Sequence, residues 1–135
     1  MLIVLRLKAW MYRHRMKSIA KLFDIIVRIL WKCDFPASVK FGKGLSLSGN
    51  GRGTVVHFRA ILGQDVIIGQ SVTIGSRNNI GPPIIGEHVK IGDGACVLGD
   101  IRIGDYVIIA PGAVVIHDTP NNCYVAGVPA KIIEQ

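Results

Sequence analysis

The sequence predicts an all-β fold in which short strands coil into a stacked prism behind a short α-helical segment. One observation is an apolar residue that recurs every six positions from Val39 onward and is usually followed by Gly. A period of six fits neither a helix, whose apolar period is 3.6 residues, nor an ordinary strand, whose period is 2. It fits a short strand followed by a corner, and three such units close one triangular coil. The second observation is a basic and apolar stretch over residues 1–33 that lacks this period.

These patterns divide the 135 residues into three parts. We expect an N-terminal helical segment over residues 1–33, the β-helix over residues 34–118, and a C-terminal tail over residues 119–135. A chain that is 50% apolar has enough hydrophobic residues for one core. The length therefore indicates one small domain with a helical preface.

The helical segment carries most of the net charge of +7. This segment contains one acidic residue, Asp24, and eight basic residues. The basic residues are Arg6, Lys8, Arg13, Arg15, Lys17, Lys21, Arg28 and Lys32. Apolar residues lie between them at a spacing typical of one or two amphipathic helices, with a break near residues 14–17. No apolar run is long enough to cross a bilayer, and the stretch does not resemble a cleaved signal peptide.

Two interpretations of this segment remain open. In the first, the helices cap the first coil and pack against a neighbouring subunit. In the second, the basic face and the indoles of Trp10 and Trp31 contact an anionic membrane surface. Nucleic acid is not expected as a partner, because the repeats carry both charge signs and no aromatic stacking platform.

Each repeat has two interior positions, two residues apart, which we expect to fill the prism. The second positions are Leu62, Ile68, Ile74, Ile85, Ile91, Val97, Ile103, Ile109 and Val115. The first positions are Ala60, Val66, Val72, Pro83, Val89, Ala95, Ile101, Val107 and Ala113. The register is interrupted twice, by extra residues within 46–54 and within 75–83. Insertions in a repeat array emerge as loops, often on the binding face, so both loops are candidates for function.

The three cysteines do not form a paired framework. We expect Cys33 and Cys96 to be buried as small hydrophobic residues. An odd number of cysteines without a signal peptide is typical of a reducing compartment, so we expect a cytoplasmic protein. The basic segment leaves open a position at the inner face of the membrane.

Three segments carry a resemblance to a known family. They are KLFDIIVRILWKCDFPASVKFGKGL, then VVHFRAILGQDVIIGQSVTIGSR with PIIGEHVKIGDGACVLGDIRIGDYVIIAPGAVV, and the ending DTPNNCYVAGVPAKII. Together they resemble the hexapeptide-repeat acetyltransferases of the serine O-acetyltransferase type and the related polysaccharide O-acetyltransferases. The resemblance implies a left-handed parallel β-helix, a homotrimer, and acetyl transfer from acetyl-CoA to a hydroxyl group.

The resemblance also implies a coenzyme groove between two subunits. It assigns the contacts to small residues at turns and to one lysine: Gly94, Ala95, Ala110, Gly112, Gly127 and Lys131. A small residue lets backbone donors approach the pantetheine arm, and an ammonium group serves as a point charge for phosphate. Taken singly, each of these glycines is equally consistent with an ordinary corner.

The catalytic pattern of the family is incomplete in this chain. The family uses a His as the general base and an acidic residue about fifteen positions earlier to orient it. Asp34 stands at the acidic position, but Gly49 stands where the family has His, and Gly cannot accept a proton. His57, which follows the emptied loop, is the one plausible substitute base, so the expected catalytic residues are His57 and Asp34. Asp34 is equally consistent with a turn residue that satisfies local backbone donors.

The remaining histidines do not indicate a metal site. Zinc sites on this fold use three His on adjacent coils, and His57, His88 and His117 do not share that pattern. We expect His14 on the helical surface and His88 at an outward position. No metal cofactor is expected, and acetyl-CoA is the expected co-substrate.

The expected function is acetyl transfer to a hydroxyl of a sugar or polysaccharide precursor, or of serine. The sugar is favoured because the serine enzymes carry a longer helical N-terminus and a second His, where this chain has Pro82. The alternative is a catalytically weak homologue that acts as a CoA-binding or scaffold subunit of a trimer.

Overall fold

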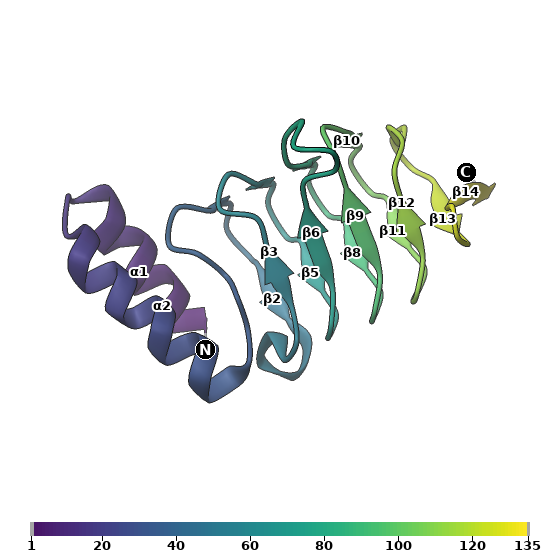
Figure 1. Cartoon of the computed structure of the whole chain (residues 1–135). Helices are drawn as coiled ribbons and strands as arrows, with labels where there is room; N and C mark the ends of the chain where they lie inside the picture. The colour runs from purple at the N-terminus through teal and green to yellow at the C-terminus, as the bar shows by residue number, and fades with distance from the viewer. Residues whose placement is uncertain (1, 135) are drawn as a thin grey trace.

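The structure is a computed structural model that describes residues 2–134. Two antiparallel helices, α1 (Leu2–Arg13) and α2 (Lys17–Trp31), lie across the N-terminal end of a three-sided prism of stacked coils (Figure 1). The predicted break between two helices near residues 14–17 is therefore confirmed. Among the described residues no helix is long and apolar enough to cross a membrane.

The prism has three sheets, and successive strands of the chain pass from one sheet to the next. The first sheet contains β1 (Lys40–Phe41), β4 (Ile61–Leu62), β7 (Ile84–Ile85) and β10 (Arg102–Ile103). The second contains β2 (Ser46–Leu47), β5 (Ile67–Ile68), β8 (Lys90–Ile91), β11 (Ile108–Ile109), β13 (Tyr124–Ala126) and β14 (Lys131–Glu134). The third contains β3 (Val55–Val56), β6 (Thr73–Gly75), β9 (Cys96–Leu98) and β12 (Val114–Val115). The predicted left-handed parallel β-helix with a helical N-terminal segment is confirmed.

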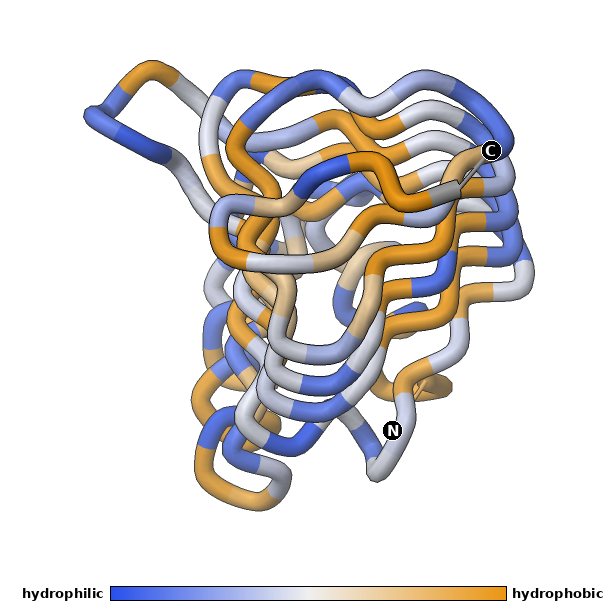
Figure 2. Tube along the Cα trace, turned by 90° about the vertical axis from the view of Figure 1, so that its right-hand side faces the viewer, coloured by the Kyte–Doolittle hydropathy of each residue, from blue (hydrophilic) through white to orange (hydrophobic). Residues whose placement is uncertain are grey.

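Stacking puts equivalent residues of successive coils side by side. Ile61 of β4 pairs with Ile84 of β7, and Ile84 pairs with Arg102 of β10, all in parallel register. Figure 2, which looks onto the C-terminal end, shows the coils lying on one another. The parallel stacking continues past residue 118 to β13, which pairs with β11, and β14 then folds back antiparallel to β13.

The interior is filled by the two apolar positions that the six-residue period predicts. Val66, Val72, Val89, Val97 and Val107 are fully buried. The interior Thr54 is also buried, and its hydroxyl donates to the carbonyl of Gly69 at 3.1 Å. The burial of these residues confirms the predicted interior. The physical reason is that successive residues of a strand face inside and outside in turn, so only every second side chain is buried.

One expectation about the cysteines is wrong. Cys33 and Cys123 are buried, but Cys96 is only half-buried. It lies between the interior residues Ala95 and Val97, so the alternation of the strand turns its side chain outward.

The helices pack on the first coil through a narrow apolar face. Leu5 of α1 and Val27 of α2 join the core cluster that contains Phe35. Lys8 is also buried there, although the sequence shows it only as one of many basic residues. Its ammonium group donates to a carboxylate oxygen of Asp24 and to the carbonyl of Phe35. The helical segment is therefore fixed to the β-helix by apolar packing and by the hydrogen bond from Lys8 to Phe35, while the Lys8–Asp24 ion pair joins the two helices.

Candidate functional site

The loop that lacks the expected histidine lies at the corner between β2 and β3. It forms a tight turn, η1 (Ser48–Gly51), in which Gly49 has φ 58°. This left-handed conformation is strained for most residues with a Cβ. A Cβ at Gly49 would also overlap the side chain of Gln70, which belongs to the next coil. The space beside Gly49 is therefore occupied by a glutamine, and a side chain at position 49 requires Gln70 to move.

Asp34 lies where the chain enters the first coil. Its backbone bridges to the third sheet, with its amide donating to Thr54 at 2.8 Å and its carbonyl accepting from Val56 at 2.8 Å. Its carboxylate faces the guanidinium of Arg28, from the last turn of α2, at 3.1 Å. This ion pair is exposed to solvent, so we expect it to contribute little to stability.

His57 lies at the opposite end of β3 from the η1 turn. Its Nδ1 accepts a hydrogen bond from the backbone amide of Arg59 at 3.1 Å, and its ring stacks on Phe58 at 4.5 Å between ring centroids. A neutral imidazole that accepts at Nδ1 carries its proton at Nε2. In this arrangement neither ring nitrogen offers a free lone pair to a substrate hydroxyl.

The structure therefore does not bring the two expected catalytic residues into one hydrogen-bonded pair. The polar partner of the Asp34 side chain is Arg28, and that of His57 is the Arg59 backbone. Both residues flank β3, the strand that follows the η1 turn. They belong to the same region of the first coils, but their side chains contact different partners.

Four of the six expected coenzyme positions fall into two groups. Gly94 and Gly112 occupy equivalent turns of neighbouring coils, between β8 and β9 and between β11 and β12, and both have φ 72°. No atom lies within 4 Å of where a Cβ would stand at either glycine, so this edge is open. Ala95 and Ala110, in contrast, are buried in the prism. Their side chains fill the core, so only their backbone is available to a ligand.

The third coil of this edge contains Gly127. Its carbonyl accepts from the amide of Val114 at 3.0 Å, which places it beside the coil that contains Gly112. Lys131 follows on β14, where it is exposed and pairs with Ala126. Gly94, Gly112 and Gly127 thus follow one edge of the prism, with an exposed lysine near its end.

The other histidines and the cysteines have ordinary surroundings. His14 and His117 are exposed. His88 is half-exposed as expected, and its ring stacks on Tyr106 at 4.6 Å between centroids. Burial raises the pKa of the Cys33 thiol to about 11, against the opposing effect of Lys8. In the part of the chain that the structure describes, no three His, Cys, Asp or Glu side chains are grouped to hold a metal ion.

The contacts of two residues in this region were not predicted from the sequence. Arg28 lies in the last turn of α2 and Gln70 lies one coil beyond Gly49, so no repeat pattern relates either residue to its partner. The position of Arg28, six residues before Asp34, is a weak sequence signal for the ion pair between them. Nothing in the sequence signals the second contact, because the loop insertion changes the length of that coil.

Known proteins share both the repeat and the fold. Residues 82–117 match the family described as bacterial transferase hexapeptide (six repeats). The serine acetyltransferase of Synechococcus elongatus is 33% identical over 131 residues, which cover 95% of this chain and 53% of that protein. The chain therefore spans about half the length of the curated relatives that it matches.

Solved structures agree with this similarity. The serine acetyltransferase of Brucella abortus strain S19 in complex with coenzyme A has a TM-score of 0.94 and 34% identity, covering 99% of this chain and 54% of that one. Soybean serine acetyltransferase complexed with serine has a TM-score of 0.89 and 29% identity, covering 96% of this chain and 54% of that one.

Proposed function

Because the chain is a hexapeptide-repeat protein of the serine O-acetyltransferase-like type, we propose that it transfers an acetyl group from acetyl-CoA to a hydroxyl group. The observation that carries the proposal is the open edge formed by Gly94 and Gly112, in a fold similar to that of a serine acetyltransferase in complex with coenzyme A. Both glycines lack a side chain and have free space beside Cα. A pantetheine arm can therefore approach the backbone closely.

The coenzyme is proposed to lie along the edge that contains Gly94, Gly112 and Gly127. Ala95 and Ala110 contribute their backbone, because their side chains are buried. Lys131 is proposed to contact a phosphate of the coenzyme as a mobile point charge. We propose that a neighbouring subunit completes this groove.

The reaction joins the acceptor oxygen to the acetyl carbon and breaks the bond between that carbon and the CoA sulfur. The acceptor hydroxyl loses a proton, and the CoA thiolate gains one. We propose His57 as the group that accepts the hydroxyl proton. Its Nδ1 must first release the Arg59 amide, since its Nε2 carries the proton in the observed contacts. Asp34 is proposed to assist by charge, and it can orient an imidazole only when Arg28 releases its carboxylate.

Two acceptors are proposed, L-serine and a hydroxyl of a sugar in a polysaccharide precursor. The similarity to a serine complex supports the first. Gly49 and Pro82 stand at positions where the resemblance to the serine enzymes implies histidines, and this difference supports the second.

A homotrimer in the cytoplasm is proposed as the working form. The outward residues of the third sheet form an uncharged row of Val55, Thr73, Cys96 and Val114. Three faces of this kind can pack around a threefold axis without burying a charge. The basic helices α1 and α2 remain outside this sheet and are proposed to make peripheral contact with a membrane.

The proposal is tested by incubating the purified chain with acetyl-CoA and a panel of acceptors that contains L-serine and sugars. Free CoA is separated from acetyl-CoA by chromatography, because the protein's own thiols would react with a thiol dye. We expect CoA to be released only when both an acceptor and the protein are present, and we expect the release to require His57. The His57→Ala variant is compared with His14→Ala, which removes an exposed histidine of the helical segment.

Three outcomes separate the alternatives. Loss of CoA release in His57→Ala alone supports the assignment of the base. Equal rates of CoA release in both variants and the wild type would show that a group other than His57 accepts the hydroxyl proton. Coenzyme binding without turnover on any acceptor contradicts the enzyme and supports a CoA-binding subunit.

A further inference from the structure

The outer side of α2 is unusually apolar for a surface helix. Its inner side is buried against the first coil through Ala20 and Val27. On the opposite side six large aliphatic residues remain exposed: Ile19, Leu22, Ile25, Ile26, Ile29 and Leu30. Ile29 and Leu30 are 69% and 65% exposed. A helix with a buried apolar face normally turns polar residues to solvent, so this second apolar face requires an explanation.

The neighbouring helix repeats the pattern. Ile3, Leu7 and Trp10 are exposed on α1, while Leu5 and Met11 are buried. The helical period places these three residues on one side of α1, because they are separated by three, four and seven positions. The two helices lie next to each other across the end of the prism (Figure 1). Their exposed apolar stripes, which we call the outer face, therefore point away from the β-helix.

Cations flank the outer face, and among them Arg28 has an acidic partner, the exposed Asp34. Lys17, Lys21, Arg28 and Lys32 lie on one flank of α2. Within α1 and α2 the one acidic residue is Asp24, and it faces inward to pair with the buried Lys8. The surface of the hairpin thus combines large aliphatic side chains with positive charge.

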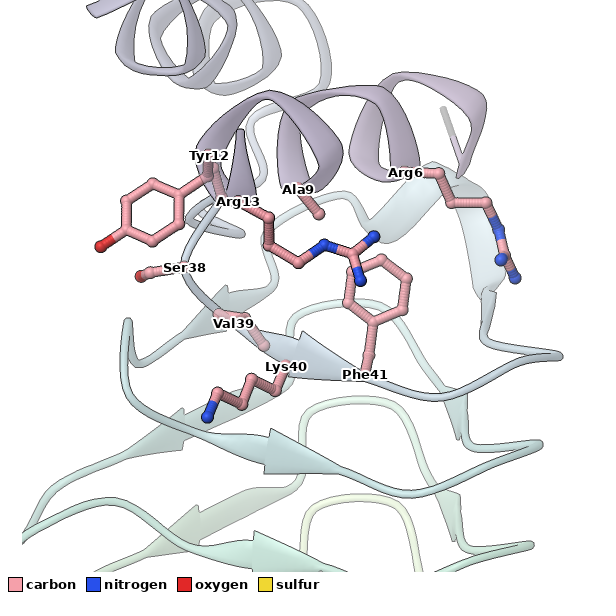
Figure 3. Close-up of a pocket in the computed structure, with 9 residues that line it drawn as sticks. Arg6, Ala9, Tyr12, Arg13, Ser38, Val39, Lys40 and Phe41 are labelled. Atoms are coloured by element: carbon pink, nitrogen blue, oxygen red, sulfur yellow. The ribbon is translucent and has the colours of Figure 1, made fainter. Parts of the chain in front are cut away.

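A basic pocket opens beside α1 (Figure 3). It has a volume of about 450 Å³ and lies between α1 and β1. Arg6 and Arg13 of α1 and Lys40 of β1 line it, together with Phe41, and no acidic residue is part of the lining. The guanidinium of Arg6 lies 6.0 Å from the centre of the Phe41 ring. The pocket can hold an anionic group next to an apolar wall.

We propose that the outer face docks on an anionic phospholipid bilayer and that the Arg6–Arg13–Lys40 pocket takes the phosphate of a lipid headgroup. Aliphatic side chains enter the boundary of the acyl chains, and flanking cations are attracted to anionic headgroups. A second copy of this chain fits less well, because it would bring the predominantly cationic flanks of two hairpins together. The inference deepens the peripheral membrane contact proposed above and does not depend on acetyl transfer.

The test is co-sedimentation of the full chain with vesicles of phosphatidylcholine alone or mixed with phosphatidylglycerol. We expect the chain to pellet with the mixed vesicles at low salt, and high salt to weaken the binding. Leu22→Ser/Ile29→Ser should lower the affinity by about tenfold or more through lost apolar burial. Arg6→Gln/Arg13→Gln should lower it by about tenfold through lost attraction to headgroups.

Matched controls have the same chemistry elsewhere on the molecule. Ile80→Ser removes an aliphatic side chain that is 69% exposed, as Ile29 is, on a loop of the prism. Lys90→Gln removes an exposed cation of β8. Both should bind the mixed vesicles as the wild type does, and thermal melting should show that all variants are folded.

Four results would overturn the inference. They are no binding to mixed vesicles, equal binding to both vesicle types, wild-type binding by the outer-face variant, or an equal loss in Ile80→Ser. If the wild type instead forms assemblies larger than a trimer that Leu22→Ser/Ile29→Ser abolishes, the occupant of the face is a second copy. Acetyl transfer is measured without vesicles, so failure here leaves the proposed enzyme activity untouched.

Discussion

Lys8 and Asp24 join the two N-terminal helices through an ion pair in which Nζ lies 2.6 Å from Oδ1. The lysine side chain is 1% exposed and the aspartate side chain 23% exposed. The same ammonium group donates to the carbonyl of Phe35 at the start of the first coil. One buried cation thus connects α1, α2 and the β-helix.

Removing the cation alone should destabilise the protein. Lys8→Ala leaves the Asp24 carboxylate and the Phe35 carbonyl without their donor, and we expect the free energy of unfolding to fall by about 3 kcal/mol. Lys8→Met/Asp24→Leu should recover most of this loss, because it removes both charges and keeps the volume. Denaturant unfolding measures all three proteins. Lys21→Ala, an exposed cation of α2, should change stability by less than about 0.5 kcal/mol. An effect of Lys8→Ala as small as that of Lys21→Ala would show that the pair is not stabilising.

Restoring a histidine at position 49 should raise activity only when space is made for it. Gly49→His alone must adopt φ near 58° and displace Gln70, and we expect it to lower stability by about 1–2 kcal/mol. In Gly49→His/Gln70→Ala the imidazole has room, and a general base typically contributes 10²–10⁴-fold. Turnover and thermal stability are measured together, with Gln70→Ala as the control. A double variant that is stable and no faster than Gln70→Ala would mean that position 49 no longer faces the acceptor.

Alkylation should distinguish the three thiols. Burial holds the pKa of Cys33 at about 11 and also raises that of Cys123, whereas Cys96 is half-buried and points outward. The thiolate is the reactive form, so at pH 8 the Cys33 thiol is protonated and should react slowly, and its labelling should increase as the pH approaches 11. Mass spectrometry of the native protein after brief treatment with N-ethylmaleimide should find Cys96 modified first. Faster labelling of Cys33 would indicate that the helical hairpin opens.

Lys131 should contribute to coenzyme binding only through the phosphates of the coenzyme. Lys131→Ala should weaken CoA binding by about 1–2 kcal/mol, the value of one charge-assisted contact. Calorimetry should show little change for a pantetheine fragment, which lacks the phosphates. Lys90→Ala serves as the matched exposed lysine. A similar loss for CoA and for the fragment would mean that Lys131 acts through the fold of β14.

A charge in the uncharged row should prevent assembly. Sedimentation of the wild type at micromolar concentration should give about three times the chain mass of 14.6 kDa. Val114→Glu buries a carboxylate in the proposed subunit contact and should yield monomers with reduced CoA binding. Ile84→Glu places the same charge on the outer side of the first sheet and should remain trimeric. A wild type that is monomeric and still binds CoA would contradict the shared groove.

Much of the fold could be predicted because the period of six encodes it directly. Val66 and Ile68 repeat as Val72 and Ile74, so each strand and corner is specified by the residues that form it. The incorrect expectation for Cys96 arose from the residue type, since cysteines are often buried. The same alternation that places Ala95 and Val97 inside already requires Cys96 to face outward.

By itself the sequence determined the coils and their interior, because these depend on residues that are neighbours or lie at one fixed spacing. Only the tertiary structure decided which residues of different elements meet. In the folded chain Lys8 is buried against Asp24, Asp34 forms an ion pair with Arg28, and Gln70 lies beside Gly49. Each of these contacts joins a helix to a coil, a helix to a helix, or two coils separated by a loop insertion. Their geometry follows from how the elements pack and from the length of each coil, and no repeating pattern carries that information.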